Sequence, residues 1–457
     1  MFSSGYYRSA PPWLQDWLLS ARALGRKMAR ESGTFHGIRA ELDRTQHWTR
    51  EEAALVQAQR LTSVIRRAAR HVPYYRDRFR TLGLDAEKME FPRDLHRIPL
   101  LTKVEVRAAG RRLVADDAGK PMISGSTSGT TGSPVWFHQD LNAVTREHAF
   151  IWRHLRWAGL RPGDRRAWLR GEPIVPADRN DPPYWRRNYA DNMLMLSSLH
   201  LSHRNAPRYL EALAEFDPVV LQAYPSSVSF LAAWMMEHGK RYAGRSLRTV
   251  VTSSEMFDPR QREQVATAFG CKVMDWYGLA ERVAAIGMCE RGSYHVMMDY
   301  GYVEFIPTEF EGLVEPVGTG FNNRAMPLLR YRCGDLVRLA PAGATCECGR
   351  HGPIVAEVIG RSDDFIKMPD GRRMAACLAG NMFRGVPGIL EGQIQQECLD
   401  SLTIRVVPSQ EYTEASEQAL LSNARARLGA NLACRVVVVD EIARTPRGKF
   451  KSVICSV

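Results

Sequence analysis

The sequence predicts an α/β protein that has a large N-terminal domain and a small α+β C-terminal domain. Two observations support this prediction. Strand and helix signals alternate through the middle of the chain, which is the pattern of an α/β sheet. After residue 361 the sequence changes to short strand-like runs around one clear helix. We therefore expect two domains, residues 1–360 and residues 361–457.

The first strong helix signal lies in residues 51–70, where apolar residues recur at the spacing of one helix face. These residues are Leu61, Val64, Ile65 and Ala68. Pro73 follows, and proline cannot continue a helix because it lacks a backbone N–H. We expect this helix to end before Pro73.

The strand–helix alternation is clearest in the middle of the chain. Residues 248–253 are rich in β-branched side chains and predict a buried strand. Asp258 and Pro259 predict a helix start, because aspartate caps free backbone amides and proline suits the first helical position. Gly270 suits the end of that helix, and residues 271–276 predict the next strand. The C-terminal part is predicted to hold a helix over Tyr412–Leu428 and strands over 402–407 and 434–440.

The composition indicates a soluble globular protein of 457 residues with 45% hydrophobic and 25% charged side chains. The N-terminus has no continuous apolar segment, and no stretch is apolar enough to span a membrane, so we expect a cytoplasmic protein. Nine cysteines without a secretory signal predict free thiols or a metal site rather than disulfides. The net charge of +12 suits an anionic ligand, either nucleotide or nucleic acid.

The segment from Ser124 to Phe137 is a loop rich in glycine and hydroxyl side chains. Glycine lets backbone amides turn toward an anion, while the hydroxyl groups donate hydrogen bonds to its oxygens. The loop does not have the Gly-Lys-Ser/Thr ending of a Walker A motif, because Gly132 is followed by Ser133 and Pro134. The candidate polyphosphate-binding residues are Thr127, Ser128, Gly129, Thr130, Thr131 and Gly132.

This loop resembles the phosphate loop of adenylate-forming enzymes, the superfamily of acyl-CoA synthetases and adenylation domains. Further segments resemble motifs of that superfamily in the same order; they are Thr252–Glu255, Asp275–Glu281, Arg330–Asp335 with Arg361, and Arg444–Lys449. The resemblance is closest to the phenylacetate–CoA ligase branch and its capsule-biosynthesis relatives, and it covers the chain from about residue 50 to the C-terminus. It implies a large N-terminal domain of layered sheets and helices, followed by a small mobile domain.

The resemblance implies roles in ATP binding for the motif residues. Glu281 would bind Mg²⁺, Asp335 would accept hydrogen bonds from the ribose hydroxyls, and Arg361 would reach the ribose or the phosphates. Tyr277 would stack on adenine, with Ser254 and Glu255 on its other side. The remaining candidate ATP-binding residues are Asp275 and Gly278.

The resemblance also implies the catalytic and substrate-binding residues. Lys449 would bridge the incoming carboxylate and the α-phosphate, and Glu281 would act with it through the metal. Asp363 matches the hinge of the small domain. The acid would bind beside Tyr224, Trp276 and Met256, whose bulky side chains suit an aryl or medium-sized acid, although aromatic residues at strand ends are usually core residues.

Four positions differ from the pattern of the superfamily. Ser133 replaces a common lysine or arginine, Ala280 replaces a serine or threonine, and Cys333 replaces a threonine. Residues 368–370 replace an expected glycine in a segment that normally approaches the pantetheine tunnel. This last change is an argument against coenzyme A as the acceptor rather than against the use of ATP.

Four cysteine and histidine residues have the spacing of a zinc site. Cys289 and His295 are six positions apart, and Cys346 lies two positions before Cys348. Three thiolates and one imidazole form a closed tetrahedral set, which is typical of structural zinc. His351 is an alternative fourth ligand, and unrelated reduced cysteines are the alternative to a metal site.

We therefore expect an ATP-dependent ligase that adenylates an aryl or medium-sized carboxylic acid with Mg²⁺, releases pyrophosphate, and transfers the acyl group to coenzyme A, a carrier-protein thiol or an amine. One alternative is an adenylate-forming enzyme that activates a non-carboxylate group or makes an amide or N–N bond. A catalytically silent relative and a zinc-stabilised nucleic-acid-binding protein are more distant alternatives. We expect neither nucleic acid nor membrane as a partner.

Overall fold

The computed structural model describes residues 2, 4–31, 33–126, 135–361, 365–370, 373–375, 381–383, 385–428, 432–445 and 448–457. The candidate phosphate loop, Thr127–Gly132, and the candidate hinge Asp363 lie outside these residues. The chain forms two compact units. The first unit contains Met1–Leu24, Gly159–Val273 and Ile359–Val457, and the second contains Gly25–Ala158 and Met274–Val358.

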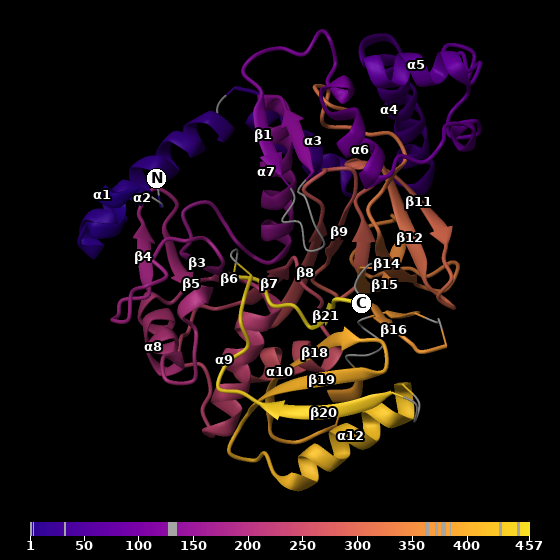
Figure 1. The fold of residues 1–457 in the computed structure, drawn as a ribbon. Coiled ribbons are helices and arrows are strands. Elements are labelled where there is room, and N and C mark those ends of the chain that lie inside the picture. The colour runs from indigo at the N-terminus through magenta and orange to yellow at the C-terminus, as the bar shows by residue number, and fades with distance from the viewer. Residues whose placement is uncertain are drawn as a thin grey trace. The chain divides into compact units, whose positions relative to one another are not determined.

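The first unit contains a parallel sheet whose strands follow the order β5-β3-β6-β7, with β4 antiparallel to β5 at its edge (Figure 1). Its strands are β3 (Arg166–Arg170), β4 (Trp185–Asn188), β5 (Met193–Ser197), β6 (Val220–Ala223) and β7 (Thr249–Ser253). Its helices are α1 (Gly5–Ser9), the start of α2 (Pro12–Glu31), η3 (Ser198–His200), α8 (Ala206–Phe216), α9 (Pro225–Glu237) and α10 (Pro259–Phe269). The predicted strand–helix–strand pattern is confirmed here.

Local sequence signals explain the bounds of α10. The Asp258 side chain accepts a hydrogen bond from the backbone of Arg260, Pro259 occupies the first turn, and Gly270 ends the helix with φ of 63°. The buried residues Val265 and Phe269 of this helix pack into the same apolar cluster as Leu221 and Val250 of the sheet. Burial of such side chains supplies most of the stability of a sheet covered by helices.

The C-terminal part of the first unit has its own sheet and its own core. A four-stranded sheet has the order β20-β19-β18-β21, and helix α12 lies along it (Figure 1). The elements are β16 (Phe365–Lys367), β17 (Arg373–Ala375), η4 (Asn381–Phe383), β18 (Ile389–Cys398), β19 (Ser401–Pro408), α12 (Glu414–Leu428), β20 (Ala433–Val438) and β21 (Val453–Cys455). Ile394, Ile404 and Leu420 are completely buried in the core between sheet and helix. This is the predicted small α+β part.

The second unit combines helices near the N-terminus with a largely antiparallel sheet. Its helices are α3 (Phe35–Thr45), α4 (Arg50–His71), α5 (Pro73–Thr81), η1 (Leu95–Arg97), α6 (Lys103–Ala109), η2 (Gly110–Leu113) and α7 (Leu141–Trp157). Its strands are β1 (Ile123–Ser126), β2 (Trp136–Gln139), most of β8 (Lys272–Gly278), β9 (Ala285–Met288), β10 (Tyr294–Val296), β11 (Gly301–Pro307), β12 (Val314–Gly320), β13 (Tyr331–Arg332), β14 (Asp335–Leu339) and most of β15 (Ile354–Arg361). Helix α4 ends before Pro73, as predicted.

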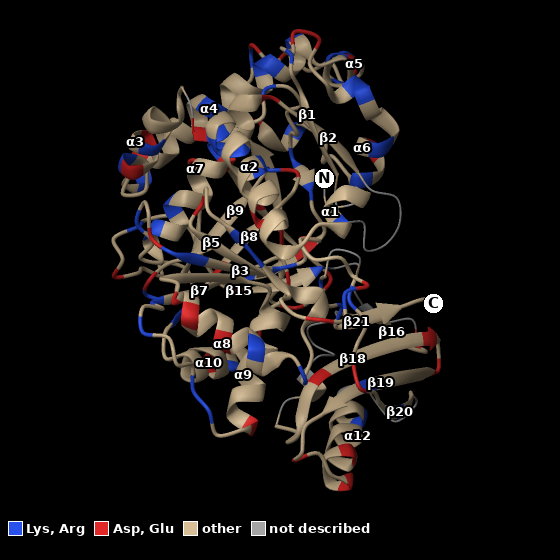
Figure 2. Cartoon of the chain, turned by 90° about the vertical axis from the view of Figure 1, so that its left-hand side faces the viewer, with Lys and Arg blue, Asp and Glu red and all other residues tan. Residues whose placement is uncertain are grey.

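Arginines of α4 and α5 are neutralised locally by acidic residues (Figure 2). The pairs are Arg67 with Asp117, Arg70 with Glu87, Arg76 with Asp116, and Arg78 with Glu105. Surface ion pairs contribute at most about 1 kcal/mol each. Their consequence here is that much of the positive charge on these helices is matched by nearby carboxylates.

Candidate active site

The carboxyl ends of the parallel strands in the first unit carry several of the predicted residues. Ser254 and Glu255 follow β7, Tyr224 follows β6, and Arg170 ends β3. Ser198 follows β5. Ligands of open α/β sheets bind at this edge, because loops that leave adjacent parallel strands converge there.

The loop that carries Lys449 docks at this edge. The Lys449 ammonium donates a hydrogen bond to the carbonyl oxygen of Ser254 at 3.2 Å. The backbone N–H of Phe450 donates to one oxygen of Glu255 at 2.7 Å, and the backbone N–H of Ser226 donates to the other at 3.0 Å. Glu255 therefore connects the lysine loop to the start of helix α9. The structure brings together Ser254, Glu255 and Lys449, which are predicted to share one site.

The glycine before Lys449 is required by two close approaches. Gly448 has φ of 69°, and a Cβ atom added to it would lie 2.4 Å from Ser198 Oγ and 2.8 Å from Gly171 Cα. The turn is closed by Thr445, whose carbonyl accepts from Gly448 N at 2.7 Å and whose hydroxyl accepts from Lys449 N at 3.0 Å. Only glycine fits this backbone conformation and this gap without displacement of its neighbours.

Arg170 holds Ser254, and no sequence motif indicated this residue. Its guanidinium donates to Ser254 Oγ at 2.8 Å and lies 4.8 Å from the centroid of the Tyr224 ring. Burial raises the pKa of Tyr224, and the nearby Arg170 charge partly opposes that shift. The Tyr224 hydroxyl is therefore protonated at neutral pH.

Among the described residues, left-handed backbone at non-glycine positions occurs in or directly after three of the predicted motifs, as well as at Asn192 and Asp217. Ser254, Arg282 and Arg330 have φ of 74°, 57° and 48°. Non-glycine residues in this left-handed region cost about 1 kcal/mol or more each, and they persist where the surroundings hold them. The Arg330 guanidinium donates hydrogen bonds to both carboxylate oxygens of Glu304, at 2.9 and 2.8 Å. Ser254 is fixed in a similar way, because its hydroxyl accepts a hydrogen bond from Arg170.

In the second unit, half-buried Tyr277 and buried Asp335 form a hydrogen-bonded pair. The Tyr277 hydroxyl donates to Asp335 Oδ2 at 2.7 Å and lies 3.6 Å from the sulfur of Cys333. Burial and the charge of Asp335 raise the pKa of Tyr277 well above its usual value, so this hydroxyl stays protonated. The structure thus brings Tyr277 and Asp335 together, with Cys333 beside them.

Glu281 is held by a second tyrosine. The Tyr331 hydroxyl donates to Glu281 Oε1 at 2.9 Å, and Glu281 is 8% exposed. Burial and the Glu281 charge raise the pKa of Tyr331, so it remains a donor. Glu281 Oε2 makes no hydrogen bond to any residue within the described ranges. A fixed carboxylate with one available oxygen fits a Mg²⁺ ligand.

The other predicted residues of the β8 motif have structural contacts. Asp275 accepts a hydrogen bond from the Tyr294 hydroxyl at 3.0 Å and is buried. Trp276 packs against the apolar cluster around Phe35, Ala149 and Tyr300. Gly278 leaves room for that indole, because an added Cβ would lie 2.6 Å from Trp276 Nε1.

The remaining predicted residues lie in the first unit. Met256 lies against Gly360, where an added Cβ would be 2.8 Å from the methionine sulfur. Arg361 is the half-buried last residue of β15. Met368, which replaces the expected glycine, is buried in the core of the C-terminal part.

The four predicted zinc ligands come together in the second unit. Their ligand atoms all lie within 4.8 Å of one another; the residues are Cys289, His295, Cys346 and Cys348. The sulfurs of Cys289 and Cys346 are 3.7 Å apart, and the sulfur of Cys348 is 3.2 Å from His295 Nε2. A tetrahedral zinc with bonds of about 2.3 Å places its sulfur ligands roughly 3.8 Å apart. The alternative ligand His351 is exposed and is not in this group.

The protonation of His295 suits a metal ligand. Burial, with a smaller effect of the Arg350 charge, lowers the pKa of His295 to about 4, so its imidazole is neutral at pH 7. Burial raises the pKa of the Cys289 thiol to about 12. A bound cation would favour the thiolate there, because thiolates rather than thiols bind metals.

Comparisons with known proteins agree with these motifs. Residues 367–456 match the family described as the CapK C-terminal domain. CapK of Staphylococcus aureus is 23% identical over 402 residues, which are 87% of this chain and 88% of CapK. A phenylacetate–coenzyme A ligase of Thermus thermophilus is 28% identical over 335 residues, which are 69% of this chain and 72% of the ligase.

A solved structure shares the fold. The crystal structure of 2-hydroxyisobutyryl-CoA ligase in its postadenylation state, in complex with R3-HIB-AMP, has a TM-score of 0.71 and 20% identity. The likeness covers 91% of this chain and 92% of the ligase. The prediction from the motifs is confirmed: the chain is a relative of CapK and of the phenylacetate–CoA ligases, and it has the fold of an adenylate-forming CoA ligase.

Proposed function

We propose that this chain is an ATP-dependent ligase that activates a carboxylic acid as its adenylate and then forms the thioester with coenzyme A. A carboxylate oxygen bonds to the α-phosphorus of ATP, and the bond from that phosphorus to pyrophosphate breaks. The acyl group then passes to the sulfur of coenzyme A, and AMP leaves. Relatives that are phenylacetate–CoA ligases support this reaction class.

The observation that carries the proposal is the position of Lys449. Its ammonium lies 3.2 Å from the Ser254 carbonyl, at the carboxyl edge of the parallel strands, although the two residues are 195 positions apart. Two anions must meet in adenylation, so a cation at the reacting atoms lowers the barrier. Glu255 fixes the loop, and Gly448 allows its close approach.

Residues of the second unit would act on the nucleotide and its metal. Asp335 would accept hydrogen bonds from the ribose, while the Tyr277 hydroxyl fixes the orientation of its carboxylate. Glu281 would hold Mg²⁺, which supplies positive charge to the phosphates when bound. The loop Thr127–Gly132 would bind the β- and γ-phosphates, and Arg361 the ribose or phosphates.

The acid is proposed to be an aryl or medium-sized carboxylic acid that binds beside Tyr224 and Met256. Tyr224 directly follows strand β6, and Met256 follows the Ser254 turn, so both lie at the edge where Lys449 docks. A carrier-protein thiol or an amine is the alternative acceptor. These acceptors are included in the test because Met368, a buried core residue, replaces the glycine expected in the segment that normally approaches the pantetheine tunnel.

We further propose that the cluster of Cys289, His295, Cys346 and Cys348 binds one structural Zn²⁺. Four protein ligands leave no open position for a substrate, which favours a structural over a catalytic ion.

The test is acid-dependent exchange of labelled pyrophosphate into ATP, screened over aryl, fatty and amino acids. We expect exchange with one class of acid. Lys449→Ala should lower it by about 100-fold or more, since oriented electrostatic groups supply about 3 kcal/mol of transition-state stabilisation. Lys451→Ala, two positions along the same loop, is the matched control and should retain exchange. Absence of exchange with every acid, in folded protein that binds ATP, would reject adenylation of a carboxylate.

The acceptor is identified in a second assay with the active acid. Coenzyme A should give the thioester and stoichiometric AMP. If AMP release instead requires hydroxylamine or another amine, the adenylation step stands and coenzyme A as the acceptor is rejected.

A further inference from the structure

Helix α2 buries two polar side chains beside Leu19 and exposes several large apolar ones. Gln15 and Ser20 are buried, whereas Trp13 and Trp17 are 63% and 61% exposed. An ordinary surface helix turns its apolar stripe to the core, whereas only Leu19 of the large apolar residues of α2 is buried in an apolar cluster and the tryptophans face outward. An apolar face that points outward indicates a contact with something outside the chain.

The buried side of α2 is fixed by hydrogen bonds rather than by apolar packing alone. Gln15 Nε2 donates to the carbonyl of Tyr7 at 2.7 Å. Asp16 accepts from the backbone N–H of Arg187 at 3.0 Å, and Ser20 Oγ accepts from the backbone N–H of Tyr189 at 2.9 Å. These bonds determine which side of the helix faces outward.

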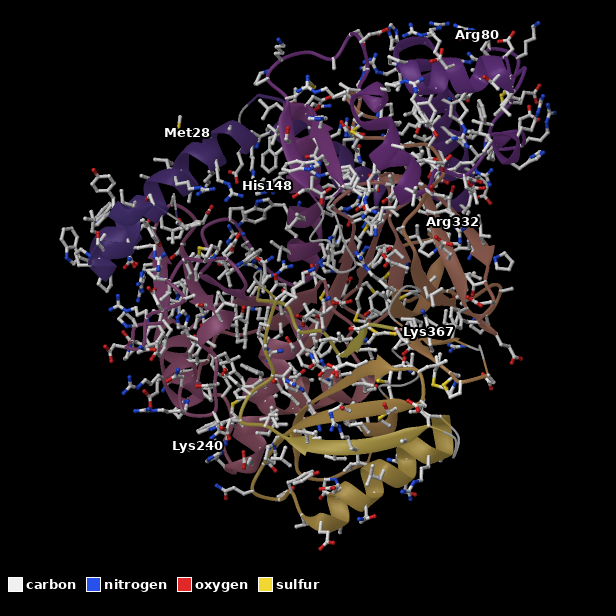
Figure 3. The ribbon with its side chains drawn as sticks, viewed as in Figure 1. Met28, Arg80, His148, Lys240, Arg332 and Lys367 are labelled. Carbon is white, nitrogen blue, oxygen red and sulfur yellow. The ribbon has the colours of Figure 1, made fainter. Side chains whose placement is uncertain are left out.

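The outward side is a continuous apolar stripe. Trp13, Trp17, Leu24 and Met28 are spaced by 4, 7 and 4 positions, which places them on one face of a helix. Leu24 is 50% and Met28 is 66% exposed, and Figure 3 shows Met28 pointing away from the ribbon. The ring of Tyr189 lies 5.3 Å from that of Trp17 and extends the stripe beyond the helix.

The charges of α2 favour an anionic surface. Its four basic residues are Arg22, Arg26, Lys27 and Arg30, against two acidic residues, Asp16 and Glu31. Both carboxylates are already engaged, Asp16 by the Arg187 backbone and Glu31 by His148 at 3.2 Å. Arg22 and Arg26 are exposed. A basic helix with tryptophan on its apolar face lies in the interface of a bilayer, where indole rings sit at the headgroup level and basic residues attract anionic lipids.

We propose that α2 binds the surface of a bilayer that contains anionic lipids, with Trp13, Trp17, Leu24 and Met28 inserted at the headgroup level. The chain would lie on the membrane without crossing it: across the ranges that the structure covers, no helix is long and apolar enough to span a bilayer. This departs from the expectation, drawn from sequence, of no membrane partner. The expectation differs because the spacing of apolar residues in the sequence does not say whether that side of the helix faces the protein or the solvent.

The experiment is flotation of the full chain with phosphatidylcholine vesicles, with and without about 30% phosphatidylglycerol. We expect binding to the anionic vesicles that weakens in about 0.5 M salt, because salt screens exposed charges. The double variant Trp13→Ser/Trp17→Ser should bind at least tenfold less. Trp136→Ser is the matched control, because Trp136 is 61% exposed in strand β2, outside the stripe. Arg22→Gln/Arg26→Gln should remove most of the preference for anionic vesicles.

Circular dichroism and the melting temperature show whether each variant is folded, and the replaced side chains are exposed, so folding should be unchanged. A wild-type chain that stays with the unbound fraction would overturn the proposal. So would a wild-type dimer that Trp13→Ser/Trp17→Ser converts to a monomer, because a second copy would then cover the stripe. Equal loss of vesicle binding in Trp136→Ser would also overturn it.

Discussion

The Cys/His cluster and the Lys449 loop are both small polar sites, but they are assembled in different ways. The cluster joins two short segments, and its sulfurs of Cys289 and Cys346 are 57 positions apart. The lysine loop contacts Ser254 across 195 positions and Ser198 across 250. The first can be predicted from spacing within each segment. The second depends on a sheet that brings separate loops to one edge.

The largest expected difference concerns stability. Cys346→Ser should abolish binding of the proposed Zn²⁺ and lower the free energy of unfolding by roughly 3 kcal/mol, because a structural ion contributes directly to folding. Elemental analysis and urea denaturation measure both effects. Cys271→Ser, a half-buried cysteine outside the cluster, is the control and should retain the metal. A Cys346→Ser protein with full metal content would exclude this ligand set.

The two units should also differ in how far acid lowers their stability. His154 is buried in the second unit, where burial lowers its pKa to about 4 from an ordinary 6.5. Between these pH values the unfolded chain binds more protons, so the free energy of unfolding falls as the pH is lowered. For His154 the loss is about 2 kcal/mol between pH 7 and pH 5.

Urea denaturation at both pH values measures this slope, and His154→Gln should reduce it. His203→Gln is the comparison variant, because His203 is an exposed histidine of the first unit. An unchanged slope in His154→Gln would show that other groups cause the acid sensitivity.

The lysine loop should respond to a single methyl group. Gly448→Ala places a Cβ 2.4 Å from Ser198 Oγ in a left-handed backbone, and we expect kcat/KM for exchange to fall about 30-fold, or about 2 kcal/mol. Ser198→Gly in the same chain should restore part of the activity by removing the closest atom. Gly239→Ala, with φ of 59° and no atom within 4 Å, tests the backbone effect alone and should keep full activity.

The smallest effect is expected at the Glu281 carboxylate. Tyr331→Phe removes one hydrogen bond to a charged group, which contributes about 1 to 2 kcal/mol, so exchange should fall several-fold and need more Mg²⁺. Tyr7→Phe is the control, because it removes a buried tyrosine hydrogen bond, to the carbonyl of Ile174, in the first unit. If both variants show the same Mg²⁺ dependence as wild type, Glu281 is not the metal ligand.

The sequence predicts elements whose signals are local and misses those that depend on tertiary contacts. Helix α10 begins and ends where its cap residues predict, and α12 begins at Glu414 rather than Tyr412. Strand β18 contains many polar residues, with Glu and Gln recurring along it, and the sequence pattern predicts no strand there. It forms because β19 and β21 pair with it on both sides.

The residues of the candidate sites also divide into those with a local sequence signal and those without one. The four candidate zinc ligands could be named from spacing, whereas Lys449, Glu281 and Asp335 could be named only by family resemblance. Arg170 and Ser198 lie in no motif, because their importance arises from contacts with residues far away in the chain. Contacts between residues that are far apart in the chain leave no local pattern in the sequence by which they could be predicted.

The strained turn at Ser254 has a consequence for protein engineering. Glycine at this position would remove a conformational penalty of about 1 kcal/mol, so selection for heat resistance alone would favour Ser254→Gly. The same change deletes the hydroxyl that Arg170 holds and loosens the carbonyl that Lys449 contacts. A library selected for thermal tolerance is therefore expected to accumulate stable chains with impaired catalysis, unless activity is screened in every round.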